Sequence, residues 1–70
     1  MSKETVMCYA ARTDGKPGYS AVLVDDPAYK KETAKDIARW IREGRTVERV
    51  SMKVAHAGMD EFLAARKAQL

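Results

Sequence analysis

The stretch 25–44, DDPAYKKETAKDIARWIREG, decides the fold because it contains the signals for both ends of one helix. Two aspartates precede Pro27, and an aspartate cap followed by proline at the first helical position is a typical helix start. Gly44 stands where a left-handed C-terminal cap belongs. The pattern therefore predicts a helix over 27–43.

This predicted helix has one apolar face. Apolar side chains recur at helical spacing: Ala34, Ile37, Ala38 and Ile41. Positions three and four apart share a helix face, so we expect this face to pack against the core. Tyr29 and Trp40 lie along one edge of the apolar face, and we expect them to be half-exposed, as anchors of a protein contact are.

Two strands precede the helix. The blocks 5–12 (TVMCYAAR) and 19–25 (YSAVLVD) are rich in β-branched and aromatic residues. Between them, 13–18 (TDGKPG) is a cluster of turn residues. A short connection with glycine and proline is typical of a hairpin with a longer loop. The sequence therefore predicts two antiparallel strands.

A third strand and a second helix are expected after the first helix. In 46–55 (TVERVSMKVA), apolar and polar residues alternate, which indicates a strand with one buried face. In 59–70, acidic residues stand in the first turn, basic residues stand in the last, and the apolar positions lie near helical spacing. Those apolar positions are Met59, Phe62, Leu63 and Leu70.

These elements predict a small α+β domain with the order ββαβα. A strand–helix–strand crossover is strongly biased to be right-handed and makes the second and third strands parallel in direction. The first strand is apolar on both faces, as a central strand would be. We therefore expect a three-stranded antiparallel sheet in the order 2-1-3, with one main helix and a C-terminal helix, as a single domain over 1–70.

Length and composition limit the function classes. Seventy residues allow one small domain and exclude a multidomain enzyme. The net charge is +3, and 33% of the residues are charged, which is typical of a globular chain. A single cysteine cannot close an internal disulfide, and the apolar run 6–11 is too short for a signal-peptide core or a membrane span. We therefore expect a cytoplasmic protein that does not enter membranes.

No motif in the sequence predicts chemistry. Cys8 and His56 could approach each other if the first and third strands are neighbours, but no oxyanion site or orienting residue accompanies them. We interpret them as a buried strand cysteine and a turn histidine. One cysteine and one histidine are too few for structural zinc, and no phosphate-binding glycine loop is present. The sequence predicts no enzyme, no metal and no cofactor.

Basic residues along one flank of the first helix and beyond it leave a nucleic-acid-binding module open as an alternative. These residues are Lys31, Lys35, Arg39, Arg42, Arg45 and Arg49. A basic stripe is typical of a phosphate binder. However, acidic residues lie on the adjacent flank, and Asp36 with Arg39 can pair at helical spacing. We favour a solvated helix face.

The favoured function is a non-enzymatic protein-binding or regulatory module. One helix covers one face of the sheet, so the second face needs the C-terminal helix or another molecule. Chains of this size without disulfides or metal are seldom stable without association. We therefore expect a protein partner, possibly a second copy in a homodimer. The predicted interface residues are Val22, Val24, Tyr29, Trp40, Met59, Phe62 and Leu63.

Overall fold

Three strands form one antiparallel sheet, flanked by two helices, in a computed structural model that describes residues 6–68. The elements are β1 (Met7–Arg12), β2 (Ala21–Val24), the 3₁₀ turn η1 (Pro27–Tyr29), α1 (Lys30–Arg42), β3 (Thr46–Ser51) and α2 (Met52–Ala68). The sheet order is β2-β1-β3, and β1 pairs antiparallel with both neighbours. The predicted α+β class, ββαβα order and strand order are confirmed. Thr5 and Leu70, where the first predicted strand begins and the last predicted helix ends, lie outside the described residues.

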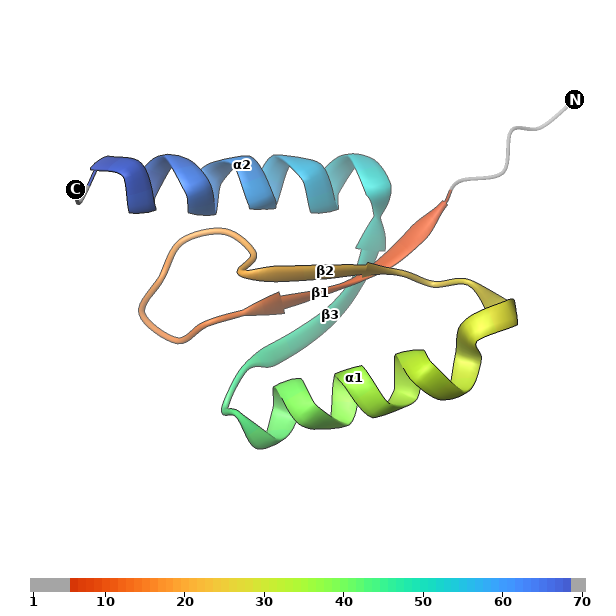
Figure 1. The fold of residues 1–70 in the computed structure, drawn as a ribbon. Coiled ribbons are helices and arrows are strands. Elements are labelled where there is room, and N and C mark those ends of the chain that lie inside the picture. Colours follow the sequence, from red (N-terminus) through yellow and green to blue (C-terminus); the bar gives the residue numbers. More distant parts are fainter. Residues whose placement is uncertain (1–5, 69–70) are drawn as a thin grey trace, which may run out of the picture.

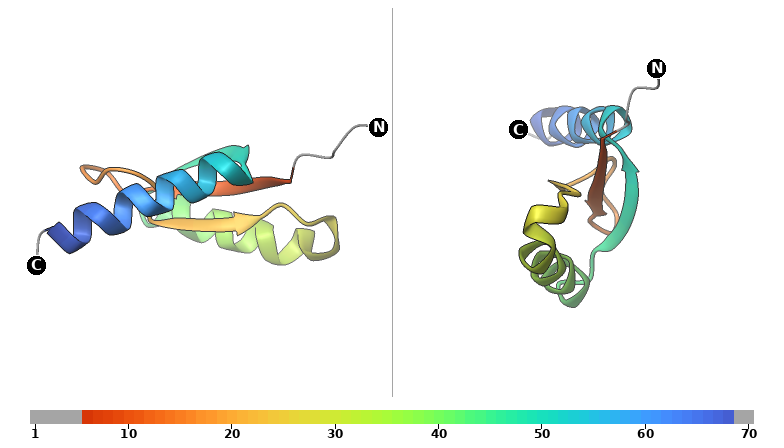
Figure 2. Two further views of the ribbon diagram at one scale, coloured as in Figure 1. Left: turned by 90° about the horizontal axis from the view of Figure 1, so that it is seen from above. Right: turned by 90° about the vertical axis from the view of Figure 1, so that its right-hand side faces the viewer.

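The two helices lie on opposite faces of the sheet (Figures 1 and 2). Tyr9 pairs with Leu23 on one side and with Arg49 on the other, so these three residues share a face. This is the α1 face, because Tyr9 and Arg49 line a hollow with residues of α1. The alternate positions, including Cys8 and its partners, therefore face α2. The C-terminal helix thus packs on its own sheet. Neither helix in residues 6–68 has the length and apolar character of a membrane span.

The core is built mainly from small side chains. Its buried apolar residues are Cys8, Ala10, Ala11, Tyr19, Trp40 and Ala55. Among residues 6–68, the largest side chain that is fully buried is the small side chain of Cys8, at 1% exposure. Small side chains on β1 let α2 approach the sheet closely, but they bury little apolar area. Little hydrophobic stabilisation is therefore available per residue.

The predicted C-terminal end of the first helix is confirmed, but the predicted start at Pro27 was wrong for the α-helix, because Pro27–Tyr29 forms a 3₁₀ turn and α1 begins at Lys30. The Asp26 carboxylate accepts a hydrogen bond from the Ala28 backbone N–H at 2.9 Å and caps η1, which leads into α1. At the other end Gly44 has φ +87°, and the Arg45 N–H donates to the Trp40 carbonyl. This is the bond pattern of a helix that ends in a left-handed glycine.

The third strand is shorter than predicted. The expected strand over 46–55 was wrong beyond Ser51, because α2 begins at Met52 and not at Met59. The Ser51 hydroxyl accepts a hydrogen bond from the Val54 backbone N–H at 3.3 Å, as a serine at a helix N-cap does. Alternation of apolar residues continues into the first turn of the helix, so periodicity alone did not mark this boundary.

The apolar face of α1 is also rotated from the prediction. Thr33 and Trp40 are the buried residues of the helix, and Ile37 between them is half-buried. Ala34, Ala38 and Ile41 of the predicted face are exposed. Burial of the large Trp40 side chain removes more apolar area from water than burial of an alanine does, so the helix presents Trp40 to the sheet. The predicted core face therefore forms an apolar flank beside the true contact.

Two glycines let the hairpin loop pass against α2. A Cβ atom at Gly58 would overlap the ring of Tyr19, and one at Gly18, where φ is +73°, would overlap the Gly58 carbonyl oxygen. The Tyr19 backbone N–H donates to that same carbonyl at 2.9 Å. The α2 backbone at Gly58 thus contacts both the hairpin backbone and the ring of Tyr19.

We predict that Gly58→Ala destabilises the fold. Alanine is favoured over glycine inside a helix by about 1 kcal/mol. The clash with Tyr19 should outweigh this gain and lower the free energy of unfolding by about 1–3 kcal/mol, as overpacking does. Urea unfolding, followed by Trp40 fluorescence, measures the change.

The control is Ala64→Gly, on the exposed side of the same helix, which should cost about 1 kcal/mol through helix propensity alone. Adding Tyr19→Ala should remove the clash, so Gly58→Ala should then be neutral or stabilising. A stabilising effect of Gly58→Ala in the otherwise unchanged chain would contradict the close packing.

Candidate functional site

A groove runs between the open edge of β2 and the neighbouring flank of α1. We call it the β2-edge groove. It is lined by Val22, Leu23, Val24, Asp26, Tyr29, Glu32, Thr33 and Asp36, with a volume of about 540 Å³. It forms because α1 lies on one face of the sheet while no strand within residues 6–68 pairs with the outer side of β2.

Two large apolar side chains at this groove are exposed. Val24 is 44% exposed and Tyr29 is 61% exposed. Val22, another predicted interface residue, is half-buried beside them. The structure thus brings three of the seven predicted interface residues together along one side of the molecule. Adjacent exposed apolar side chains of this kind mark interaction sites more often than isolated ones do.

The β2 edge also presents backbone hydrogen-bonding groups. The Asp25 N–H donates to the Met7 carbonyl at 2.9 Å, which fixes the phase of the ladder between β1 and β2. In an antiparallel ladder, alternate residues of a strand direct their N–H and C=O groups toward opposite sides. The N–H and C=O of Val22 and the N–H of Val24 therefore point to the open edge. Such groups can pair with an added strand.

The rim of the groove is acidic. Asp26, Glu32 and Asp36 line it, and no lysine or arginine does. Asp36 forms an ion pair of 3.4 Å with Arg39, which lies three residues further along α1. Glu32 makes no ion pair within residues 6–68. From the sequence, we expected Glu32 and Asp36 to be solvated charge and Asp26 to belong to the helix start. The i, i+4 spacing of Glu32 and Asp36 was the available signal that they share one flank.

Trp40 does not belong to this surface. It is 6% exposed and packs on the sheet side of α1, so the prediction that it is half-exposed was wrong. The reason is its position seven residues after Thr33, which brings both residues to the same side of the helix. Trp40 is a core residue.

The three predicted interface residues of α2 form a separate region. Phe62 and Met59 are half-buried, and Leu63 is 52% exposed. Met59 and Leu63 line a shallow hollow with His56 and Asp60 on α2 itself. None of these residues lines the β2-edge groove. The predicted interface is therefore divided between two parts of the surface.

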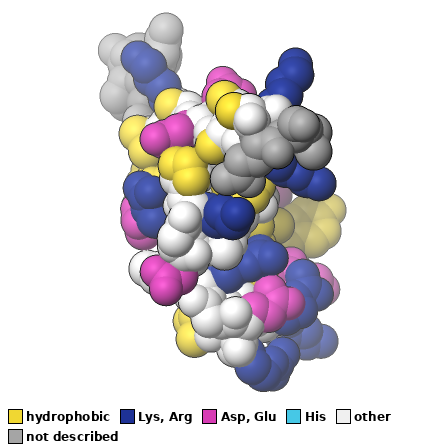
Figure 3. All heavy atoms as spheres, turned by 90° about the vertical axis from the view of Figure 1, so that its left-hand side faces the viewer, with side chains coloured by type: hydrophobic (Ala, Val, Ile, Leu, Met, Phe, Trp, Pro, Cys, Tyr) yellow, Lys and Arg dark blue, Asp and Glu magenta, His cyan; other side chains and the backbone are white. Residues whose placement is uncertain are grey.

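The predicted basic residues divide into two groups. Three are engaged by carboxylates: Arg39 by Asp36, Arg45 by Glu43 and Arg49 by Asp25. The other three are exposed on the outer side of α1, and no ion pair to them is found in the described chain: Lys31, Lys35 and Arg42. Basic side chains gather at the lower part of one face of the molecule, with acidic side chains among them (Figure 3).

A second hollow lies between α1 and the α1 face of the sheet. Tyr9, Lys30, Ile37 and Arg49 are among its lining residues. Arg49 donates to Asp25 at 3.0 Å, and this ion pair spans β1 from β3 to the end of β2. Asp25 and Arg49 at this hollow therefore neutralise each other, and Lys30 is the remaining charged residue among those that line it.

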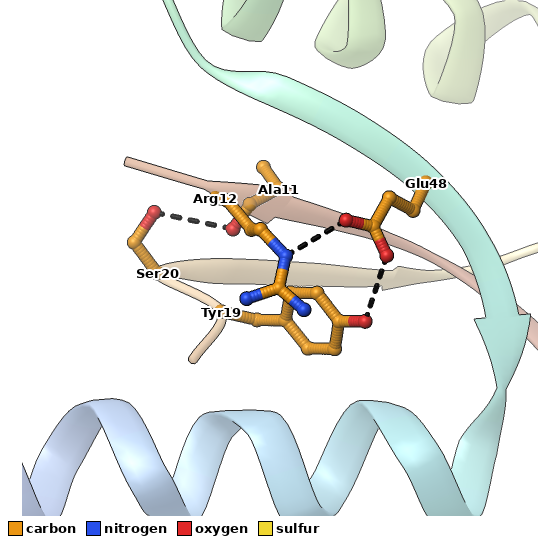
Figure 4. Close-up of polar contacts among 5 residues, drawn as sticks. All are labelled: Ala11, Arg12, Tyr19, Ser20 and Glu48. Carbon is orange, nitrogen blue, oxygen red and sulfur yellow. Dashed lines mark hydrogen bonds and ion pairs between the residues drawn. The ribbon is translucent and has the colours of Figure 1, made fainter. Parts of the chain in front are cut away.

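On the opposite face, Arg12, Tyr19 and Glu48 form a polar cluster (Figure 4). The Arg12 Nε donates to Glu48 at 2.7 Å, and the Tyr19 hydroxyl donates to the other carboxylate oxygen at 3.0 Å. The Arg12 guanidinium also lies over the Tyr19 ring, 4.6 Å from its centroid. Hydrogen bonds from Arg12 and Tyr19 lower the pKa of Glu48. Burial, followed by the Glu48 contact, raises the pKa of Tyr19.

Cys8 and His56 do not form a catalytic pair. Cys8 is buried in β1, whereas His56 is exposed on α2 and is not a turn residue as predicted. Burial, assisted by the negative charge of Asp25, raises the pKa of the Cys8 thiol, which is opposite to the shift that activates a nucleophile. Within residues 6–68, no group of three histidine, cysteine or acidic side chains is arranged to hold a metal ion.

Comparison with protein-family profiles, curated proteins and solved structures finds no match to this chain.

We predict that Glu48→Gln reduces the acid sensitivity of the fold. A carboxyl group with a lowered pKa stabilises the folded state above its ordinary value of 4.5, and this stabilisation is lost as the pH falls through the folded-state pKa. Glutamine does not titrate, so the variant should start less stable at neutral pH and lose less on acidification. Thermal melts at pH 7 and at about pH 3 measure both effects.

The matched control is Glu61→Gln, because Glu61 is exposed and makes no ion pair in the described part of the chain. This variant should keep the acid sensitivity of the original chain. An equal loss on acidification in Glu48→Gln and in the original chain would show that the cluster contributes nothing.

We predict that Cys8 reacts slowly in the native state. The buried, protonated thiol should be labelled roughly a hundredfold more slowly than the same thiol in the urea-unfolded chain, since reaction requires local opening. Cys8→Ala should lower the free energy of unfolding by about 1–2 kcal/mol through lost packing. Native labelling as fast as in urea would show that Cys8 is accessible and would contradict the packing of α2 on its face of β1.

Proposed function

We propose that this chain is a non-enzymatic protein-binding module that acts through a protein–protein interface. The observation that carries the proposal is the β2-edge groove, where Val24 and Tyr29 are exposed beside an unpaired strand edge. A contact there would cover apolar side chains and satisfy backbone groups together. The small core supports the proposal, because a partner would add the burial that the chain lacks.

The proposal includes a regulatory role without chemistry, cofactor or metal. The protein would act by occupying a surface of its partner. The partner could be a second copy, which would make a homodimer, and we propose the cytoplasm as its location because a single cysteine suits a reducing compartment.

Nucleic-acid binding is the second candidate. It is favoured by Lys31, Lys35 and Arg42, which project from the outer side of α1 and are not engaged by carboxylates in residues 6–68. Against it stand the ion pairs of Arg39, Arg45 and Arg49, which use half of the predicted basic residues. Only a short basic ridge is left to contact phosphates.

Photo-crosslinking from Tyr29 tests the favoured function. Tyr29 is replaced by a photoreactive phenylalanine analogue, the captured protein is identified, and its binding is measured again with both components purified. We expect a saturable complex that Tyr29→Ala weakens at least about tenfold, as loss of an interface aromatic does. The same analogue at the exposed position 67 on α2 is the control. A chain that stays monomeric over a hundredfold range of concentration and captures nothing that binds again when purified would refute this function.

Salt dependence tests the second candidate. Each phosphate that a protein neutralises makes its affinity fall more steeply with salt. A phosphate binder should therefore bind short duplexes much more weakly at about 200 mM salt than at about 50 mM salt. We expect no shift of DNA or RNA duplexes even at low salt. Binding that Lys31→Glu and Lys35→Glu together abolish would instead establish the nucleic-acid function.

A further inference from the structure

We propose that the β2-edge groove binds an extended segment of a partner protein, in which lysine or arginine residues alternate with apolar residues, as a fourth strand of the sheet. This inference rests on the proposed protein-binding function and specifies the partner. Three features of the groove carry it: the hydrogen-bonding groups of the edge, the exposed apolar side chains and the sign of the rim charge.

The edge groups specify an extended segment. The outward N–H and C=O of Val22 lie within one strand, and they match the spacing of a second strand running beside β2. Addition of a strand supplies main-chain hydrogen bonds, while alternate side chains of the added segment supply selectivity. A helix could not pair with these backbone groups.

The apolar side chains specify every second residue of the segment. Side chains of an added strand would alternate between the two sheet faces. Side chains of the segment that point to the α1 face would meet Leu23 and the ring of Tyr29. Side chains that point to the α2 face would lie beside Val24, at the end of the cross-strand row that Val24 forms with Cys8. Covering Val24 and Tyr29 would remove two exposed apolar side chains from water.

The acidic rim specifies the charge of the segment. Asp26, Glu32 and Asp36 all line the groove, and only Asp36 among them has an arginine partner in the described structure. A lysine or arginine on the segment would meet carboxylates and could also lie over the Tyr29 ring. An acidic segment would place like charges opposite each other.

The same charges disfavour a second copy at this edge. A two-fold pairing of β2 with β2 brings identical surfaces together, so the Glu32 and Asp36 carboxylates of one copy would approach those of the other. Like charges placed opposite each other are destabilising. A basic segment from a different protein has no such cost.

Two short peptides test the proposal directly: one of four lysine–valine repeats and one of four glutamate–valine repeats. Each is titrated into the intact, isotope-labelled chain, and amide resonances and hydrogen exchange are recorded. We expect the lysine peptide to bind at least about tenfold more tightly than the glutamate peptide. We also expect the amides of Val22 and Val24 to exchange more slowly in its presence.

Charge variants separate the groove from general electrostatics. Glu32→Lys with Asp36→Lys should reverse the preference, so that the glutamate peptide binds more tightly. The control, Asp60→Lys with Glu61→Lys, changes the net charge equally on exposed positions of α2 and should leave the preference intact. Thermal melts confirm that both variants are folded.

Several outcomes would overturn the proposal. Equal binding of the two peptides would show that the groove does not select a basic strand. Slower hydrogen exchange of β3 amides in place of β2 amides would show the same. Absence of binding would do the same, while crosslinking from Tyr29 would still decide whether the chain binds proteins. Concentration-dependent protection of Val22 and Val24 without peptide would identify a second copy as the occupant.

Discussion

The close packing of α2 on the small side chains of β1 and on the hairpin is the constraint on which the rest of the structure depends. Cys8 and Ala10 face α2, Ala11 faces the α1 side, and all three are buried in a sheet only three strands wide. Where α2 meets the hairpin, two glycines bring one backbone onto the other, and Tyr19 lies under Gly58. This arrangement closes both faces with few bulky residues, so it leaves a core with limited apolar burial.

The edges of the sheet are exposed because it has only three strands. Three strands have two open edges, and the two helices cover faces and not edges. At the β2 edge, the flank of α1 adds carboxylates and the exposed ring of Tyr29 to an unpaired strand. No lysine or arginine lines this groove, although Arg39 pairs with Asp36 at its rim. One surface therefore combines apolar exposure, free main-chain groups and negative charge.

The three strands, their order in the sheet and the C-terminal end of α1 could be predicted because local chemistry determines them. Asp26 and Gly44 cap the helix segment, and the apolar character of β1 on both faces identifies the central strand. The start of α2 could not be found from periodicity, because Val50 and Met52 continue one alternation across the Ser51 cap. The inward side of α1 depends on how tryptophan packs against the sheet, which is a tertiary effect. The acidic groove depends on which helix flank faces which sheet edge, and sequence spacing does not contain that information.

We infer that this chain has a marginal core and propose that an added basic strand at β2 stabilises it. Urea unfolding at low micromolar concentration, followed by Trp40 fluorescence with and without the lysine–valine peptide, tests this most directly. We expect a free energy of unfolding at or below about 5 kcal/mol for the chain alone, with a midpoint that rises when the peptide is present. A free energy above about 10 kcal/mol, together with a midpoint that the peptide does not change, would contradict it.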